Sequence, residues 1–591
     1  MYHSTVTRLK SHLIAGVGVA SVMLLTSGAI AAPQLVLVNA KVFTADPALP
    51  YAQAVAIEDG RILAVGRNEQ VLALTGPNTR IIDTGGRLVT PGLTEAHVHL
   101  GDALPTPPLA MPALPFPGPG PTAEEILAAV EQAAKTRTDW VSAYIGPLIA
   151  RDRRNWRKAL DAVAPNAPVL LRAPWGHNSF TNSEGLRRLG IAEDTADPLG
   201  GWWGRDEYGR LDGRAYEAET IMPRIQPATA ERLATLFGEA QQRYARWGVT
   251  SIHLMNNDKS LEVTLAGLAI AKPLQRWTVY SWGTYETQEV PEAWAAIERV
   301  AKQTMPKVRI EGPKWMMDGT PIEQNSLQRA DYVDRPGWRG RSNFSNEQLR
   351  EILQLALTRS TQLALHVVGD AETDRVLKMM EQLAPAATWR AKRVRIEHGD
   401  GIGRDVFERV AQLGVVVTQN PTHLAIPPIA GKKMLDHEVA LKGLVNAGIP
   451  LALGSDGGVN EQNPFLNLML AVLSQRSFRG HNARTGADGL HERRSLRGGA
   501  GKTPGTASAW FCRGLCRALS GCFDSANATH PDDDELANDG RWRSDLRRCA
   551  MDVAPLVRKS VSGQKPTSTR RCGRSVLPPR ADLFRPNCAT S

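Results

Sequence analysis

The stretch "LVTPGLTEAHVHLGD", from Leu88 to Asp102, places two histidines, His97 and His99, one residue apart after a Pro-Gly. On a β-strand, residues i and i+2 point to the same face, so both imidazoles are expected on one side of a strand end. Two neutral imidazoles side by side can bind one metal ion, because histidine is the commonest metal ligand. An isolated HxH pair also arises by chance, so the rest of the chain must show whether this pair binds a metal.

The sequence around this stretch predicts a barrel. Residues 91–475 alternate short strand-like runs with longer helical patterns, such as "SNEQLREILQLALTRS", which opens with a capping box from Ser345 to Gln348. Strands alternating with helices imply parallel strands joined by crossover helices. Eight strands are expected, counting the HVH strand and the runs at 167–174, 248–255, 307–319, 362–370, 393–400, 414–421 and 449–458. This pattern predicts an α/β fold, a (β/α)8 TIM-type barrel with inserted loops, one of them the Pro-rich segment 103–122.

Two further segments precede the barrel. Residues 32–90 contain short β-branched runs and a hairpin signal at Glu58-Asp59-Gly60, which predicts a small antiparallel, β-sandwich-like domain. Residues 1–31 combine Arg8 and Lys10, an apolar run from Leu13 to Leu25, and Ala29-Ile30-Ala31. This order is typical of a cleavable secretory signal, so we expect export to the periplasm. No other stretch is apolar for about 18 residues, so no membrane span is expected after cleavage.

Polar residues stand at the ends of several predicted strands, where barrel active sites are built. Each has an ordinary structural explanation by itself, such as a surface lysine, a hydrogen-bonded core histidine or a turn aspartate. Six of them at successive strand ends are hard to assign to chance. These candidate metal ligands are His97, His99, Lys314, His366, His398 and Asp456.

The order HxH, Lys, His, His, Asp resembles the amidohydrolase superfamily, and within it the amidohydrolase 3 (YtcJ-like) group of metal-dependent hydrolases. The resemblance covers residues 33–472 and rests on "PGLTEAHVHL", "GPKWMMDGT", "LALHVVGD", "RIEHGD" and "LALGSDGG". The segment "GHNSFTNSEGLRRLGI", residues 176–191, matches the substrate-loop pattern of that group. The chain departs from the group at Glu95, where aspartate is common, and at "HVVGD", where "HAIGD" is usual.

The resemblance implies two divalent metals, zinc being the expected ion. His97 and His99 would hold one ion, His366 and His398 the other, and Lys314 would bridge them as a carbamate. Asp456 would contact the first ion and act as the catalytic acid and base. The expected reaction is hydrolysis of an amide, N-formyl or cyclic amide bond in a small molecule, with His177, Asn182 and His253 as candidate substrate-binding residues. A mononuclear, deaminase-like hydrolase and an inactive binding barrel stay open as alternatives, as does a homodimer.

The C-terminal segment differs from the rest of the chain. Residues 476–591 contain 18 Arg, 3 Lys and all six cysteines, and they carry a net charge of +10, so residues 1–475 are neutral overall. A neutral body does not indicate nucleic-acid binding. The segment that in this group returns to the small β domain, resembling "KGSLAPGKLADLVVL", is missing. We therefore expect a frameshift near residues 474–486 and an aberrant, disordered tail that could leave the protein inactive.

Overall fold

The computed structural model describes residues 32–100, 109, 120–218, 229–256, 260–282, 289–303, 305–425, 441–457 and 462–481. The expected secretory signal, most of the Pro-rich loop and the tail beyond residue 481 lie outside these residues, so those expectations stay predictions. Within the described ranges, no helix is both long and apolar enough to cross a membrane.

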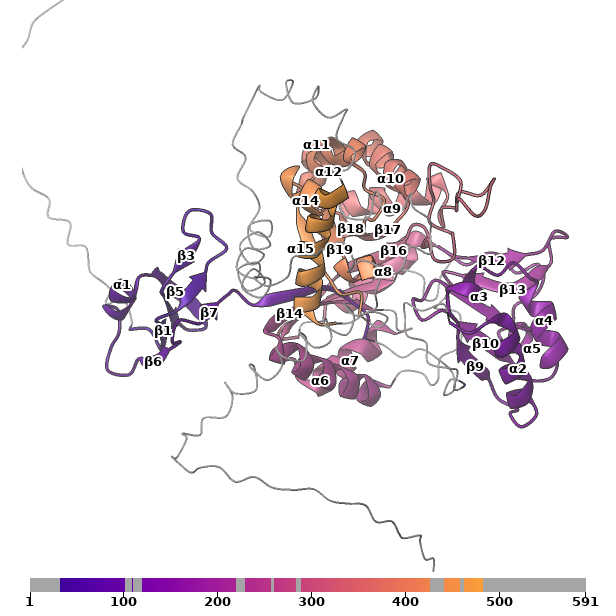
Figure 1. The fold of residues 1–591 in the computed structure, drawn as a ribbon, viewed down its shortest axis with the longest axis horizontal. Helices are drawn as coiled ribbons and strands as arrows, with labels where there is room; N and C mark the ends of the chain where they lie inside the picture. Colours follow the sequence, from indigo (N-terminus) through magenta and orange to yellow (C-terminus); the bar gives the residue numbers. More distant parts are fainter. Residues whose placement is uncertain are drawn as a thin grey trace, which may run out of the picture. The chain divides into compact units, whose positions relative to one another are not determined.

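The centre of the fold is an eight-stranded parallel sheet, in the spatial order β20-β19-β18-β17-β16-β15-β14-β8. Figure 1 labels β14 and β16 to β19 of this sheet. It closes into a barrel because β8 and the end of β20 meet through a parallel bridge between Val98 and Gly457. This confirms the predicted TIM-type barrel. The strands are β8 (Leu93–Val98), β14 (Val249–Asn256), β15 (Arg276–Trp282), β16 (Val308–Met316), β17 (Ala364–Val367), β18 (Arg395–His398), β19 (Val416–Gln419) and β20 (Leu451–Leu453).

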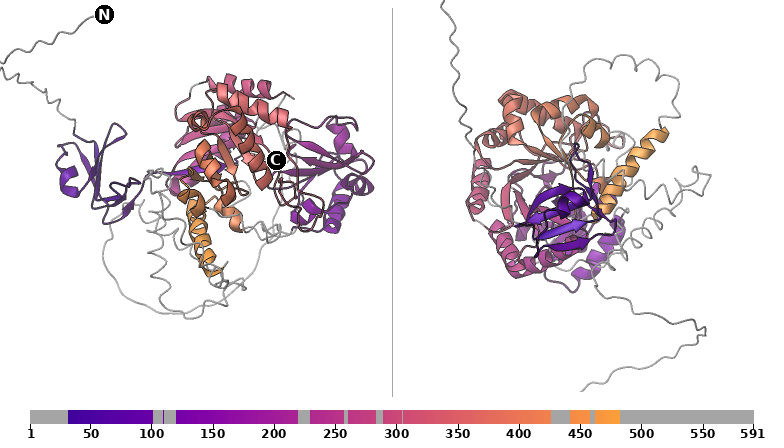
Figure 2. Two further views of the ribbon diagram at one scale, coloured as in Figure 1. Left: turned by 90° about the horizontal axis from the view of Figure 1, so that it is seen from above. Right: turned by 90° about the vertical axis from the view of Figure 1, so that its left-hand side faces the viewer.

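Helices surround the barrel strands (Figure 2). Their apolar faces pack on the sheet, and parallel strands covered in this way are buried on both faces, as in β17 and β18. The predicted capping box of α9 is present, with Ser345 and Gln348 each bonding the backbone of the other. The helices are α6 (Ala230–Arg246), α7 (Leu261–Ala271), α8 (Val290–Ala301), α9 (Asn346–Thr358), α10 (Asp370–Leu383), α11 (Ala386–Lys392), α12 (Phe407–Leu413), α14 (Leu441–Asn446) and α15 (Pro464–His481), with 3-10 turns η1 (Arg404–Val406) and η2 (Pro421–Ala425).

One predicted barrel strand was wrong. The run at 167–174 forms β10, which pairs with β9 and β11 in a separate sheet, and the missing barrel strand is β15, "RWTVYSW". Both runs are mostly buried, and hydrophobic periodicity does not reveal which sheet such a run joins. The separate sheet has the order β12-β13-β11-β10-β9 and forms an insertion after β8, where only loops were expected. Its elements are α2 (Ala123–Ala134), β9 (Val141–Tyr144), α3 (Pro147–Arg151), α4 (Trp156–Val163), β10 (Val169–Arg172), β11 (Asn178–Thr181), α5 (Ser183–Arg188), β12 (Trp202–Arg205) and β13 (Leu211–Tyr216).

The N-terminal strands form their own two sheets, in the orders β5-β4-β1-β6 and β3-β2-β7. The predicted hairpin is present as β4 and β5, but the domain is not purely antiparallel, since β1 pairs with β6 and β2 with β7 in parallel. A sequence run does not show the direction of its partner. The elements are β1 (Leu35–Val38), β2 (Lys41–Phe43), β3 (Tyr51–Ala52), β4 (Ala54–Glu58), β5 (Arg61–Gly66), α1 (Asn68–Leu72), β6 (Arg80–Asp83) and β7 (Leu88–Val89).

Candidate metal centre

Barrel closure brings the first and last strands together at their carboxyl ends. The backbone N–H of Asp456, which follows β20, donates to the carbonyl of His97 at 2.9 Å. Glu95 reinforces this junction, because its Oε1 accepts the N–H groups of His97 at 3.1 Å and Ser455 at 2.8 Å. Glu95 therefore spans the junction between β8 and the segment that follows β20. Asp456 and the HxH pair, 357 residues apart at their closest in the numbering, face the same small volume.

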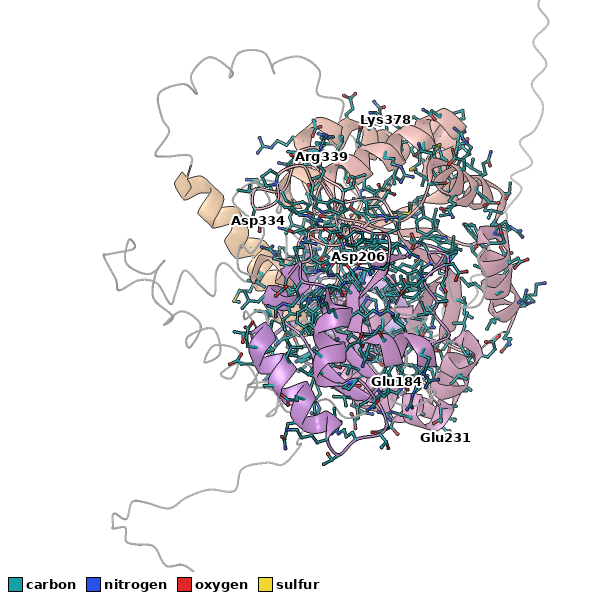
Figure 3. All side chains as sticks on the ribbon, turned by 90° about the vertical axis from the view of Figure 1, so that its right-hand side faces the viewer. Glu184, Asp206, Glu231, Asp334, Arg339 and Lys378 are labelled. Atoms are coloured by element: carbon teal, nitrogen blue, oxygen red, sulfur yellow. The ribbon has the colours of Figure 1, made fainter. Side chains whose placement is uncertain are left out.

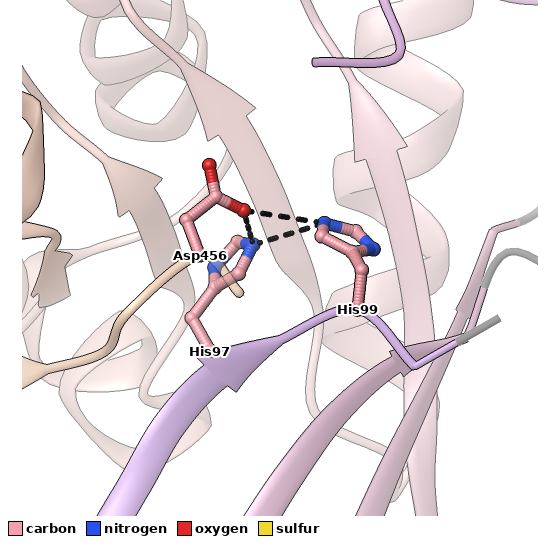
Figure 4. Close-up of side chains that lie close together, drawn as sticks. All are labelled: His97, His99 and Asp456. Carbon is pink, nitrogen blue, oxygen red and sulfur yellow. Dashed lines mark hydrogen bonds and ion pairs between the residues drawn. The ribbon is translucent and has the colours of Figure 1, made fainter. Parts of the chain in front are cut away.

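His97, His99 and Asp456 form a triangle of potential ligand atoms (Figure 4). The Nε2 atoms of the two histidines are 3.4 Å apart, and they lie 3.3 and 3.4 Å from Asp456 Oδ1. An ion with tetrahedral ligands at about 2.0–2.1 Å requires ligand atoms about 3.3–3.4 Å apart. The donor set and its spacing therefore fit a zinc-like divalent ion.

In three of the four candidate histidines, His97, His99 and His398, the Nδ1 nitrogen lies against an acceptor. His97 Nδ1 lies 2.6 Å from Glu397 Oε2, His99 Nδ1 lies 2.9 Å from the Met255 carbonyl, and His398 Nδ1 lies 2.9 Å from Asn420 Oδ1. A hydrogen on Nδ1 satisfies each of these acceptors and leaves the Nε2 lone pair for an ion. Histidines that bind metals are oriented in this way.

Lys314, on β16, is buried at this site, with Nζ 3.2 Å from His97 Nε2. Burial lowers the pKa of the Lys314 ammonium to about 8. Lysine acts as a nucleophile only without its proton, so a lowered pKa favours its reaction with CO2. Its position fits the carbamate expected from the resemblance.

A second group shares Asp456 with the first. His398, His423 and Asp456 lie close enough to hold an ion together, and His423 Nε2 is 3.3 Å from Asp456 Oδ2. The ring of His366 lies next to that of His398, with centroids 4.5 Å apart. Both nitrogens of His366 are buried with no hydrogen-bond partner, which is costly for an imidazole unless another group binds it. An ion next to His398 would fit that need.

The electrostatics agree with an anionic Asp456 beside neutral His99, His366 and His398. His423 differs, because its hydrogen bonds to Asp400 and Asp456 outweigh burial and raise its pKa to about 10. Burial raises the pKa of Asp456, but the contacts with His423 and His97 outweigh burial and hold it well below its usual range. Burial lowers the pKa of His99, His366 and His398. A carboxylate and neutral imidazoles are the protonation states that bind divalent metals.

The backbone is also unusual here, because His398 and Asp456 have φ values of 68° and 52°. Non-glycine residues at positive φ are uncommon and collect at functional sites.

The structure brings together all six candidate ligands, whose ligand and catalytic roles stay predictions.

The three candidate substrate-binding residues have different surroundings. The ring centroid of His177, from the insertion, lies 4.8 Å from that of His366. His253 instead pairs with Arg395, its Nδ1 lying 2.8 Å from Nη1. Asn182 caps α5, and its side chain bonds four backbone groups of the insertion, which leaves little capacity for a substrate.

Sequence reasoning missed three residues that contact the predicted site. His423 follows β19 and could have been found by extending the strand-end rule to that strand. Glu397 and Glu217, the partners of His97 and His177, also lie at strand ends, but no sequence signal distinguishes them from the many other acidic residues of the chain. Their roles depend on contacts between distant segments.

Comparison with known proteins identifies the family of this chain. The chain is 24% identical over 445 residues to the putative amidohydrolase YtcJ of Bacillus subtilis, covering 72% of this chain and 81% of YtcJ. It is 25% identical over 482 residues to the N-substituted formamide deformylase of Arthrobacter pascens, covering 74% and 83%. An uncharacterized metal-dependent hydrolase from Pyrococcus furiosus has the same fold, with a TM-score of 0.50, 21% identity and coverage of 74% and 88%. The Amidohydrolase family matches residues 80–498, and the chain therefore belongs to that family.

Proposed function

We propose that this protein hydrolyses the C–N bond of small amides, N-formyl amides above all, with divalent metal ions bound at the strand ends. The single observation that carries the proposal is the triangle of His97, His99 and Asp456 beside a buried Lys314. This set combines metal ligands with a carboxylate that can move a proton, and metal-assisted amide hydrolysis uses both.

The residues of the site would divide the work. His97 and His99 would hold one ion, and His366 and His398 a second, with Lys314 between them. Bound divalent ions would supply Lewis acidity, which polarises an amide carbonyl and lowers the pKa of water. Asp456 would take a proton from the attacking water at a carboxylate oxygen and return it to the leaving nitrogen.

Two ions are favoured over one because Asp456 belongs to both potential ligand groups. Both ring nitrogens of His366 are buried without a hydrogen-bond partner, and a single ion at His97 and His99 would leave them so. The mononuclear alternative predicts one ion per chain, and elemental analysis of purified protein distinguishes the two.

The substrate class draws on a relative. The Arthrobacter protein, 25% identical, is named as an N-substituted formamide deformylase. We therefore place N-substituted formamides ahead of N-acetyl and cyclic amides as substrates of this chain.

The test is a panel of N-formyl, N-acetyl and cyclic amides, assayed with zinc-loaded protein and with protein stripped by a chelator. We expect release of formate or of the other carboxylate with loaded protein, loss on stripping and recovery with zinc. Activity that survives complete stripping would contradict the metal-dependent chemistry. Folded, metal-loaded protein that cleaves none of the amides would reject the proposed reaction and favour the binding barrel.

A further inference from the structure

The insertion contributes a buried pair to the metal centre. His177 lies just before β11 and Glu217 just after β13, and these antiparallel strands are in register at Asn178 and Tyr216. The N–H of Glu217 also donates to the carbonyl of His177 at 3.2 Å. The sheet therefore sets the separation of the two side chains.

The contact between the two side chains is specific. His177 Nδ1 lies 2.8 Å from Glu217 Oε1 and 3.1 Å from Oε2, and the Glu217 side chain is only 2% exposed. Glu217 reaches this position with a φ of 52°. Its carbonyl is packed so closely on Gly201 that a Cβ there would lie 2.8 Å away. A strained residue persists where the surrounding structure demands it, and such strain is a reason to look for function.

The second ring nitrogen of His177, Nε2, belongs to a ring that packs against a histidine of the barrel. Glu217 occupies Nδ1, and no residue in the described ranges hydrogen-bonds Nε2. The ring packs at 4.8 Å from His366, one of the candidate metal ligands. His177 is thus the insertion residue placed to meet a molecule bound at the strand ends.

We propose that Glu217 is a positioning residue, which holds the His177 ring so that Nε2 hydrogen-bonds the amide group of the substrate beside the metal ligands. This inference rests on the proposed function, because the bound molecule is the amide to be cleaved. Glu217 acts only through His177.

A nearby acidic residue raises the question of a third ion. Glu323 is close enough to complete a ligand group with His177 and Glu217. Its carboxylate already accepts hydrogen bonds from the backbone and hydroxyl of Thr320 and from Trp175 Nε1. The Glu323 carboxylate is therefore occupied by hydrogen bonds to Thr320 and Trp175. We treat the contact between His177 and Glu217 as a hydrogen bond and not as part of a third metal site.

The test compares His177→Ala, Glu217→Leu, Glu217→Gln and the double variant H177A/E217L in the zinc-loaded protein. Losing one hydrogen bond to substrate should raise KM about tenfold, with kcat changed much less. Glu217→Leu should reproduce His177→Ala, and the double variant should be no worse than His177→Ala. Glu217→Gln should stay near wild type, because its side-chain carbonyl still accepts the Nδ1 hydrogen. Asp206→Asn, in a partly exposed carboxylate that pairs with Arg210 between β12 and β13 of the same insertion (Figure 3), is the control and should change neither KM nor kcat.

Three results would overturn the inference. Additive effects in the double variant would show that Glu217 does not act through His177. An unchanged KM in Glu217→Leu and His177→Ala would remove the substrate contact. A lower metal content in Glu217→Leu would show that the pair binds an ion instead.

A crystal structure of Glu217→Leu separates this inference from the proposed function. We expect the His177 ring to turn or to occupy several orientations, and a ring fixed as in the parent would refute positioning by Glu217. This measurement stands even if no amide in the panel is cleaved, a result that would reject the proposed function alone. If Glu217→Leu does not fold, the two remaining variants still test the inference. Glu217→Gln must then show a near-normal KM, and His177→Ala must show a raised KM.

Discussion

Replacing Glu397 by glutamine should weaken metal binding and destabilise the barrel together. Glu397 is fully buried and accepts three hydrogen bonds with its two oxygens: Arg395 Nε at 2.7 Å, Arg395 Nη2 at 3.0 Å and His97 Nδ1 at 2.6 Å. These contacts outweigh the effect of burial and hold the pKa of Glu397 well below its usual range, so its side chain is a carboxylate. Glutamine keeps the size but turns one acceptor into a donor that faces another donor.

The size of both effects follows from the two partners that Glu397→Gln leaves without a carboxylate, Arg395 and His97. Arg395 would keep its charge in the barrel interior without the carboxylate, and breaking a buried pair in this way costs about 3–5 kcal/mol. His97 would lose the acceptor that fixes its ring. Loss of such a partner lowers metal affinity about 10–100-fold, or about 1.4–2.7 kcal/mol.

Urea unfolding of the metal-free protein measures the first effect, and competition titration with zinc measures the second. Glu381→Gln is the matched control, because Glu381 also pairs with an arginine, Arg409, but is 40% exposed. Such surface pairs contribute about 0–1 kcal/mol. If Glu397→Gln binds zinc within twofold of the parent and unfolds like the control, Glu397 does not orient His97.

Three further outcomes are expected. Asp456→Asn should abolish amide turnover while metal content, measured by elemental analysis, stays near that of the parent. His97→Ala should instead lose metal. Wild-type turnover in Asp456→Asn would exclude Asp456 as the acid and base. Lys314→Ala should lose activity, with partial recovery when short carboxylic acids replace the carbamate; full activity without such additives would exclude a bridging role. Burial raises the pKa of Glu372 from its usual 4.5 to about 7, so between these pH values the folded state keeps a proton that the unfolded state loses, and stability falls as pH rises. Glu372→Gln should flatten this slope in urea unfolding between pH 4.5 and 7, and an unchanged slope would assign the pH dependence to other groups.

The sequence by itself predicted the barrel, and it selected six candidate residues for the metal centre. Buried parallel strands appear as short apolar runs, and barrel sites lie at strand ends, so His97, His99, Lys314, His366, His398 and Asp456 could be selected one strand at a time. Local patterns also determined the capping box of α9 and the hairpin of β4 and β5. The capping box, the hairpin and the strand ends depend on residues close together in the sequence, so they can be predicted from the sequence alone.

Tertiary structure decided the features that depend on contacts between distant segments. Whether the buried run of β10 joined the barrel or another sheet depended on its partners, which periodicity does not encode. Glu397 and Glu217 became recognisable only when folding placed them 2.6 Å from His97 and 2.8 Å from His177. A carboxylate has the same sequence signature on a surface and beside a buried imidazole, and only its distance from the ring in the folded chain distinguishes the two roles.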